Sequence, residues 1–131
     1  MAANTGKKSE LKRDEVKYLR DKAKARYPKG TCCAICDTTE NLEFHHYSSL
    51  TLLWEKWKVT TGVSIDDVDD VIFHRDTFIA EHEKELYEDA VTLCNGHHVK
   101  LHTVYGSKPA LFTAKKQANW VKIQHDKLHK D

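Results

Sequence analysis

The 131-residue sequence predicts an α+β fold, in which a small metal-bound core carries a mainly helical insertion and flanking helices at both ends. Two pairs of metal-capable side chains far apart in the chain, short β-prone segments beside them, and helical apolar spacing elsewhere support this prediction. The length suits one domain, residues 1–131. We divide it into a basic N-terminal helix (1–30), a core (31–106) with an insertion at about 48–88, and a C-terminal helix (107–131).

Residues 1–30 are the basic part of the chain. They hold ten Lys and Arg against four Asp and Glu, whereas the remaining residues hold eleven against sixteen. From Ser9 to Tyr27 apolar residues recur near helical spacing, and Pro28 to Gly30 ends the helix. A basic helix on an acidic body suits contact with a polyanion, and a solvated helix face is the alternative interpretation.

The next segments alternate between turn, strand and helix. Thr31 to Asn41 fits a metal-binding turn, and Leu42 to Tyr47 fits a short strand. Leu50 to Trp57 follows the spacing of a helix with one apolar face, which Thr60 to Gly62 ends.

The insertion continues with further helices. Ser64 to Asp67 predicts a capped helix start, since acidic side chains are favoured near a helix N-terminus. The four nearby aspartates lack the Gly and terminal Glu of a calcium loop, so we prefer the capped start to a cation site. A further helix is expected over about Asp76 to Tyr87.

The C-terminal part begins with a short strand, Ala90 to Leu93. This strand leads into a histidine-rich helix with the sequence LCNGHHVKLH. Gly106 to Pro109 predicts a turn, and Thr113 to Leu128 predicts a last helix with apolar residues near one side.

Two motifs predict a structural zinc site. Cys33-Ala-Ile-Cys36 and Cys94-Asn-Gly-His97 each let a tight turn present two ligands, and together they supply four tetrahedral positions. Thiolate and imidazole suit Zn²⁺ better than hard cations. Ordinary buried cysteines are the alternative interpretation. Cys32 could replace Cys33, but the x2 spacing favours Cys33.

Further histidines predict a second metal site. His98 and His102 stand at i and i+4 on the predicted helix, so their rings project from one face. A third ligand could come from His45 or His46 on the preceding strand. Because neighbours in a strand point to opposite faces, one of these two rings can face the metal while the other faces a substrate.

The order of these motifs resembles the HNH nucleases, also called ββα-metal nucleases, which include colicin DNases and many phage and homing endonucleases. The shared pattern is a cysteine knuckle, a strand that ends in HH, and a short strand leading into LC-x2-(C/H)-H-x3-H. It covers Thr31 to Ser48 and Glu88 to Gly106, about 37 of 131 residues. The resemblance implies a ββα-metal, treble-clef-like core.

The resemblance also implies a role for each remaining histidine. His45, His98 and His102 would hold one divalent ion, Mg²⁺ or Mn²⁺, with Ni²⁺ or Zn²⁺ as alternatives. His46 would be the general base that takes a proton from the attacking water, because a neutral imidazole is a competent base near neutral pH. The ion would neutralise the scissile phosphate and the leaving 3′-oxygen. The family's products are 5′-phosphate and 3′-hydroxyl ends.

The chain departs from the family pattern in two places. Asp89 stands where the family usually has the asparagine that orients the base, and we expect its carboxylate to accept a hydrogen bond from His46. Asn95, the nearest asparagine, lies inside the zinc knuckle and fits that role poorly. About forty residues are inserted between His46 and Asp89, and we expect His74 and His82 within them to be surface or core side chains.

A nuclease of this class needs phosphate contacts away from the scissile bond. Such contacts give salt-dependent, sequence-independent affinity for DNA. The candidates on the first helix are Lys12, Arg13, Lys17, Arg20, Lys24 and Arg26, and a second set on the last helix is Lys115, Lys116, Lys122 and Lys127.

The leading hypothesis is therefore a metal-dependent DNA endonuclease or nickase. The alternative is a non-catalytic zinc-binding module that binds nucleic acid or a protein partner, and a hydrolase acting on another substrate ranks below both. With no apolar run near the ~20 residues of a membrane span and no apolar leader in MAANTGKKSELKR, we expect no membrane contact and a cytoplasmic location. A phage or mobile-element origin, and so the host cytoplasm, fits a small nuclease of this kind. Monomer and homodimer both stay open.

Overall fold

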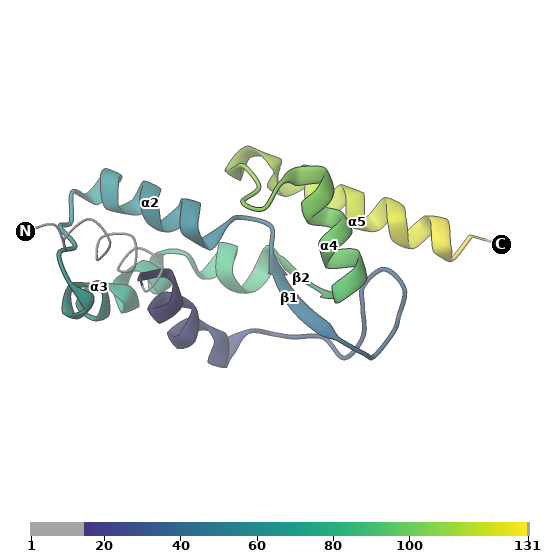
Figure 1. Ribbon diagram of the computed structural model, residues 1–131, viewed down its shortest axis with the longest axis horizontal. Coiled ribbons are helices and arrows are strands. Elements are labelled where there is room, and N and C mark those ends of the chain that lie inside the picture. The colour runs from purple at the N-terminus through teal and green to yellow at the C-terminus, as the bar shows by residue number, and fades with distance from the viewer. Residues whose placement is uncertain (1–14, 131) are drawn as a thin grey trace, which may run out of the picture.

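The structure is a computed structural model that describes residues 15–130. A two-stranded sheet lies in the middle of the molecule (Figure 1). Helices α2 (Leu50–Thr61) and α3 (Val68–Glu81) lie on one side of it along the long axis, and α4 (Asn95–Tyr105) and α5 (Ala114–Leu128) lie on the other. This mixed architecture, mostly helical with a small antiparallel sheet, confirms the predicted α+β class.

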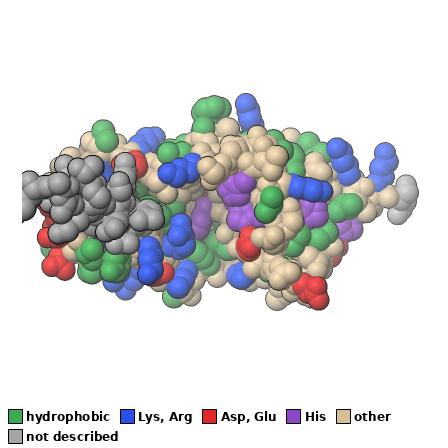
Figure 2. All heavy atoms as spheres, in the orientation of Figure 1, with side chains coloured by type: hydrophobic (Ala, Val, Ile, Leu, Met, Phe, Trp, Pro, Cys, Tyr) green, Lys and Arg blue, Asp and Glu red, His purple; other side chains and the backbone are tan. Residues whose placement is uncertain are grey.

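The sheet joins the two segments that carry the candidate site. Strand β1 (Leu42–His46) pairs antiparallel with β2 (Ala90–Cys94), with Leu42 opposite Cys94 and His46 opposite Ala90. Both strands lie within one residue of the predicted ranges. On the face shown in Figure 2, histidine side chains gather over the middle of the molecule, with Lys and Arg side chains nearby.

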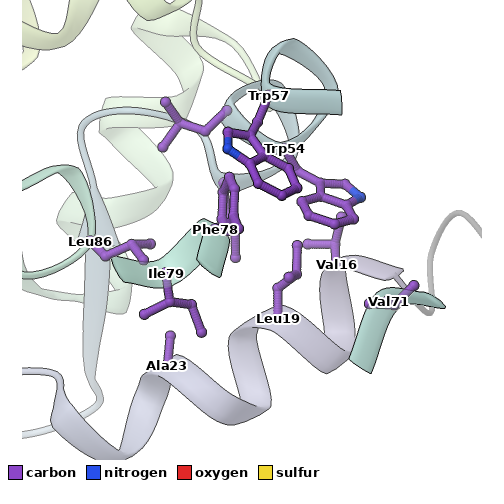
Figure 3. Packing of buried hydrophobic residues seen from close by; sticks show 11 residues of the cluster. Val16, Leu19, Ala23, Trp54, Trp57, Val71, Phe78, Ile79 and Leu86 are labelled. Carbon is purple, nitrogen blue, oxygen red and sulfur yellow. The ribbon is translucent and has the colours of Figure 1, made fainter. Parts of the chain in front are cut away.

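The first helix and the insertion share one hydrophobic core. Residues 15–23 are α-helical and continue into the 3₁₀ turn η1 (Lys24–Arg26). Figure 3 shows Val16 and Leu19 directed from this helix towards the aromatic residues of α2 and α3, and Ala23 directed towards Ile79. We call this group the insertion core; its buried members are Val16, Leu19, Ala23, Leu50, Leu53, Trp54, Trp57, Val71, Phe78, Ile79 and Leu86.

Helix α3 differs from the prediction. The capped start is confirmed, because Asp67 is the N-cap and forms a capping box with Asp70. The expected separate helix over Asp76 to Tyr87 is wrong: α3 runs unbroken to Glu81, since Val71, Phe78 and Ile79 continue one buried face. A π-helix, η2 (Lys84–Glu88), follows and leads to β2.

A second core lies on the other side of the sheet. We call it the knuckle core; its buried members are Cys33, Ile35, Leu93, Leu101 and Val121. A short 3₁₀ turn, η3 (Leu111–Thr113), precedes α5, whose Val121 closes this core. Within residues 15–130 no helix has both the length and the apolar character needed to cross a membrane.

Candidate functional site

Four side chains converge at the start of α4, as the two motifs predict. The candidate ligand atoms of Cys33, Cys36, Cys94 and His97 all lie within 4.8 Å of one another. The Sγ atoms of Cys36 and Cys94 are 3.9 Å apart, and the Nδ1 atom of His97 is 3.3 Å from Cys94 Sγ and 3.9 Å from Cys33 Sγ. A tetrahedron with zinc–ligand distances of about 2.0–2.3 Å has edges of about 3.3–3.8 Å, so this group, the knuckle cluster, fits a zinc ion.

Local backbone geometry holds the knuckle cluster in place. The Cys33 N–H donates to the Thr38 carbonyl at 2.8 Å, and the Asp37 N–H donates back to the Cys33 carbonyl at 3.0 Å, which closes a tight turn. Cys94 is the N-cap of α4. Burial disfavours the thiolate of Cys33, but hydrogen bonds from the backbone of Cys36, Cys94 and Ile35 outweigh it and lower the pKa of this thiol. The turn therefore favours the ionised form that binds metal.

Three imidazoles form a second group, the histidine cluster, between β1 and α4. His45 Nδ1 lies 3.1 Å from His98 Nε2, which lies 3.0 Å from His102 Nε2. Metal–nitrogen distances of about 2.1 Å place neighbouring ligand nitrogens about 3.0–3.4 Å apart. Both separations are thus those of ligands around one ion, and all three nitrogens lie within 4.8 Å of one another.

The outer nitrogen of each ring in the histidine cluster faces an acceptor. His45 Nε2 donates to Gln117 Oε1 at 2.7 Å, His98 Nδ1 to Glu43 Oε1 at 2.7 Å, and His102 Nδ1 to the Gly106 carbonyl at 2.8 Å. In each neutral ring the nitrogen that donates carries the proton, so the inner nitrogen is a bare lone pair. Three lone pairs directed at one another repel, and a bound cation relieves that repulsion. This arrangement fits a metal ion better than a hydrogen-bonded network.

His45 and Glu43, the acceptor behind His98, lie in different environments. His45 is 3% exposed, and burial lowers its pKa to about 4, so the ring stays neutral. Glu43 also accepts a hydrogen bond from Asn95 Nδ2 at 3.1 Å, and its bonds with His98 and Asn95 lower the pKa of its carboxyl. Asn95, expected to fit poorly beside the base, instead helps to hold Glu43 against His98.

His46 points away from His45, as neighbours in a strand do. Its ring makes edge contacts with Phe44 and Tyr27, at centroid distances of 5.2 and 4.8 Å. Its Nε2 atom is buried and has no hydrogen-bond partner among residues 15–130. Burial lowers its pKa to about 4, against an opposing hydrogen bond with the Leu86 backbone. Because that bond favours a protonated ring, Leu86 contributes its carbonyl, which leaves the Nε2 lone pair free.

Asp89 does not reach His46. Its carboxylate instead accepts two hydrogen bonds from Lys84 Nζ, at 2.8 and 3.0 Å. The π-helical turn explains this pairing, because the Asp89 N–H donates to the Lys84 carbonyl and brings the two side chains together. The predicted contact between Asp89 and His46 is therefore absent from the described residues, and His46 instead bonds the backbone of Leu86.

A cleft of about 380 Å³ joins both sides of β1. It is lined by His45, His46, His98 and His102, by Arg20 from the first helix and by Lys108 from the loop after α4. Arg20 also lies close enough to lower the pKa of His46. A cleft that combines imidazoles with two cationic side chains suits a phosphate group.

The predicted DNA contacts have different outcomes. Lys12 and Arg13 lie outside the described residues. Lys17, Arg20 and Lys24 are exposed. Arg26 is also exposed, but both its terminal nitrogens bond the Glu83 carboxylate at 3.0 Å. The second set, on α5, is exposed: Lys115, Lys116, Lys122 and Lys127.

The sequence interpretation missed three residues of this region. Glu43 carried a signal, because it lies two residues before His45 and so shares its strand face. For Lys108 the only signal in the sequence was a positive charge within a predicted turn. Gln117 carried none, since a glutamine among lysines on the last helix is typical of a solvated position, yet it is fully buried.

These features are typical of a metal-binding protein that handles a polyanionic substrate. The chain belongs to the nicking endonuclease family: a model of this family, named for the phage T5 nicking endonuclease, matches residues 1–130. Membership implies a nuclease that acts on DNA, which confirms the predicted nuclease activity and disfavours the non-catalytic zinc module, while the HNH subtype stays a prediction. No solved structure matches the chain.

Proposed function

We propose that the protein is an HNH-type, ββα-metal nickase that hydrolyses a phosphodiester bond of DNA with one divalent ion. His45, His98 and His102 hold that ion, and His46 is the general base. The observation that carries the proposal is the convergence of three inner imidazole nitrogens: His98 Nε2 lies 3.1 Å from His45 Nδ1 and 3.0 Å from His102 Nε2, and each ring is fixed from behind by an acceptor.

The knuckle cluster is assigned to a structural zinc ion held by Cys33, Cys36, Cys94 and His97. Its distances fit the tetrahedral edges of such a site. Cys33 and the neighbouring Ile35 are fully buried in the knuckle core. Zinc there would tie the turn before β1 to the start of α4, and so set the position of His98.

The donor set bears on the identity of the second ion. Mg²⁺ or Mn²⁺ is expected from the resemblance to HNH nucleases. Magnesium prefers oxygen ligands, whereas imidazole suits later divalent metals. Three imidazoles therefore favour Ni²⁺ or Zn²⁺ over Mg²⁺ at this site, with Mn²⁺ between them.

The chemistry is a hydrolysis in which His46 moves one proton. The Leu86 carbonyl holds the Nδ1 proton of His46, so Nε2 accepts a proton from a water molecule. The resulting hydroxide attacks phosphorus, the bond from phosphorus to the 3′-oxygen breaks, and that oxygen leaves with the electron pair and takes up a proton. A divalent ion bound to the histidine cluster would supply charge neutralisation of the phosphate and the leaving oxygen. The products are a 5′-phosphate and a 3′-hydroxyl.

Cationic side chains around the cleft would hold the DNA backbone. Arg20 and Lys108 line the cleft itself and are placed to contact the scissile phosphate or its neighbours. Lys17 lies on the same helix as Arg20, and Lys24 lies in the 3₁₀ turn that continues it. Both side chains are exposed and would contact phosphates further along the strand, and Lys12 and Arg13 remain predictions. In this scheme Asp89 supports the end of β1, because its carbonyl accepts a hydrogen bond from the Tyr47 N–H at 3.0 Å.

A plasmid assay tests the proposal. Supercoiled DNA of mixed sequence is incubated with the zinc-loaded protein and Mg²⁺, Mn²⁺, Ni²⁺ or Zn²⁺ in turn, and the ends are mapped. We expect conversion to the open circular form with 5′-phosphate and 3′-hydroxyl ends. His98→Ala should lose both cutting and the second, weaker metal site while keeping the structural zinc. DNA that stays supercoiled with every ion and several substrates would contradict the proposal.

A further inference from the structure

We infer that Gln117, on the C-terminal helix, is a positioning residue of the histidine cluster: it sets the tautomer and orientation of His45 and so strengthens binding of the divalent ion. This inference rests on the proposed function, because it concerns the same three-histidine site. It assigns to α5 a direct part in a site otherwise built from β1, α4 and the residue that ends α4.

Gln117 is buried, and its side chain is held in one position by its contacts. It is 0% exposed, although the residues before it are exposed lysines. A buried amide needs hydrogen-bond partners for both its oxygen and its NH₂ group, because an unpaired group has lost its hydrogen bonds to water and destabilises the fold. Gln117 finds three: Oε1 accepts from His45 Nε2 at 2.7 Å, and Nε2 donates to the Tyr47 carbonyl and to Thr113 Oγ1, each at 2.9 Å.

These partners fix which end of the amide faces His45. The Tyr47 carbonyl can only accept a hydrogen bond, so it must face the NH₂ group. Thr113 Oγ1 donates its own proton to the Ala110 carbonyl at 2.6 Å, and therefore also accepts from Gln117. A flipped amide would set its oxygen against two acceptors and its NH₂ group against His45. The oxygen of Gln117 is consequently held towards the ring.

An oxygen at this position selects one state of His45. The Nε2 atom of that ring must carry the proton in order to donate to Gln117, so Nδ1 is left as the lone pair that faces His98. His98 is oriented in the same way by the Glu43 carboxylate, and His102 by the Gly106 carbonyl. Gln117 differs from Glu43 in being neutral, so it orients its ring without adding negative charge near the phosphate.

The test measures ion binding without DNA. Protein carrying one equivalent of Zn²⁺ is titrated with Ni²⁺ by calorimetry for the wild type, Gln117→Leu, Gln117→Glu and the matched control Gln124→Leu, which makes the same change further along α5. Loss of an outer partner of a metal-bound histidine lowers metal affinity by about 10–100-fold, and we expect this for Gln117→Leu. In Gln117→Glu the buried carboxyl is expected to be protonated, because its O–H then donates towards the Tyr47 carbonyl while its other oxygen accepts from His45. This variant should restore most of the affinity, and Gln124→Leu should match the wild type.

The outcomes separate this inference from the proposed function. A wild-type protein that binds no second ion would defeat the metal site itself. A wild type that binds Ni²⁺, with Gln117→Leu binding equally well or Gln117→Glu as weak as Gln117→Leu, would show that Gln117 only packs. Long-range ¹⁵N spectra of the wild type, in case Gln117→Leu does not fold, should show the proton of His45 on Nε2. A proton on Nδ1 would overturn the inference.

Discussion

Replacing His46 by alanine removes the proposed general base and leaves the candidate metal ligands in place. The ring of His46 projects from the face of β1 opposite to His45, into contact with Phe44 and Tyr27. Its Nε2 atom is buried without a partner among the described residues. The substitution therefore removes a reactive nitrogen that contributes no hydrogen bond to the fold.

The size of the effect follows from the state of the ring. Positioned general bases contribute about 10²–10⁴-fold to a rate, which corresponds to about 3–5 kcal/mol of activation free energy. Burial lowers the pKa of His46 to about 4, so at neutral pH almost every ring is in the basic form. The same low pKa makes it a weak base, which places the expected loss towards about 10²–10³-fold.

The effect on stability should be small by comparison. Leaving a polar atom buried and unpaired costs about 1–3 kcal/mol, and the alanine variant no longer has that cost. This gain offsets part of the packing lost with the ring and of the hydrogen bond lost to the Leu86 carbonyl. We therefore expect the melting temperature of His46→Ala to fall only modestly below that of the wild type.

Single-turnover nicking of supercoiled plasmid at saturating Mn²⁺ measures the rate, and calorimetry measures Mn²⁺ binding. His74→Ala is the matched control, because it removes another half-buried histidine, packed against Trp57 and Phe73 outside the cleft. The control should nick like the wild type. A His46→Ala protein that cuts within tenfold of the wild-type rate, or that loses Mn²⁺ binding, would refute the assignment of His46.

Four further predictions test other parts of the structure. Because the lowered pKa of His46 keeps it neutral down to about pH 4, the nicking rate at ion saturation should hold as the pH falls through 6.5, and an acid limb centred there in the pH–rate profile would contradict this. Cys36→Ser should lose the structural zinc and the cooperative melting of the knuckle core, as followed by zinc content and circular dichroism, since zinc binding supplies folding free energy; an unchanged zinc content would count against the cluster. Phe78→Ala should lower the free energy of unfolding in urea by about 3–5 kcal/mol, because Phe78 is fully buried against Trp54 and Trp57, and a loss below about 1 kcal/mol would exclude a central packing role. Arg20→Ala should weaken DNA binding equally across sequences and lower the slope of log affinity against log salt by about one; an unchanged slope would remove Arg20 from the phosphate contacts.

The pairing of His98 with His102 was predictable because it depends on local periodicity. His98 and His102 share a face of α4 by helical spacing, and the chain direction of β1 brings His45 beside them once β1 pairs with β2. The spacing of Cys94 and His97 likewise follows from a cap and one helical turn. The relations within α4 and its cap are set within a few residues, so the sequence alone specifies them, whereas it left His45 and His46 open as the third ligand and the resemblance to HNH nucleases implied His45.

The partners that orient the rings depend on contacts between distant segments. Gln117 is 72 residues from His45, and nothing near it in the chain distinguishes it from a surface glutamine. Asp89 was expected to face His46, but a π-helical turn, which no residue pattern announced, brings it to Lys84 instead. Helix α3 was misplaced for a related reason: its N-cap was visible in the sequence, but its unbroken length depends on packing of Phe78 and Ile79 into the insertion core.

Strand β1 connects these observations, because its two faces serve different cores. Phe44 and His46 face Tyr27 and Leu86, which pack in or against the insertion core, whereas Glu43 and His45 face α4 and α5 on the side of the knuckle core. A one-residue shift in the pairing of β1 with β2 would exchange these faces and bury the proposed base among the metal ligands. Zinc in the knuckle cluster opposes such a shift, because Leu42 pairs directly with the ligand Cys94. The structural metal would thus act on catalysis through strand register, and its removal should reduce nicking even where the three histidines are intact.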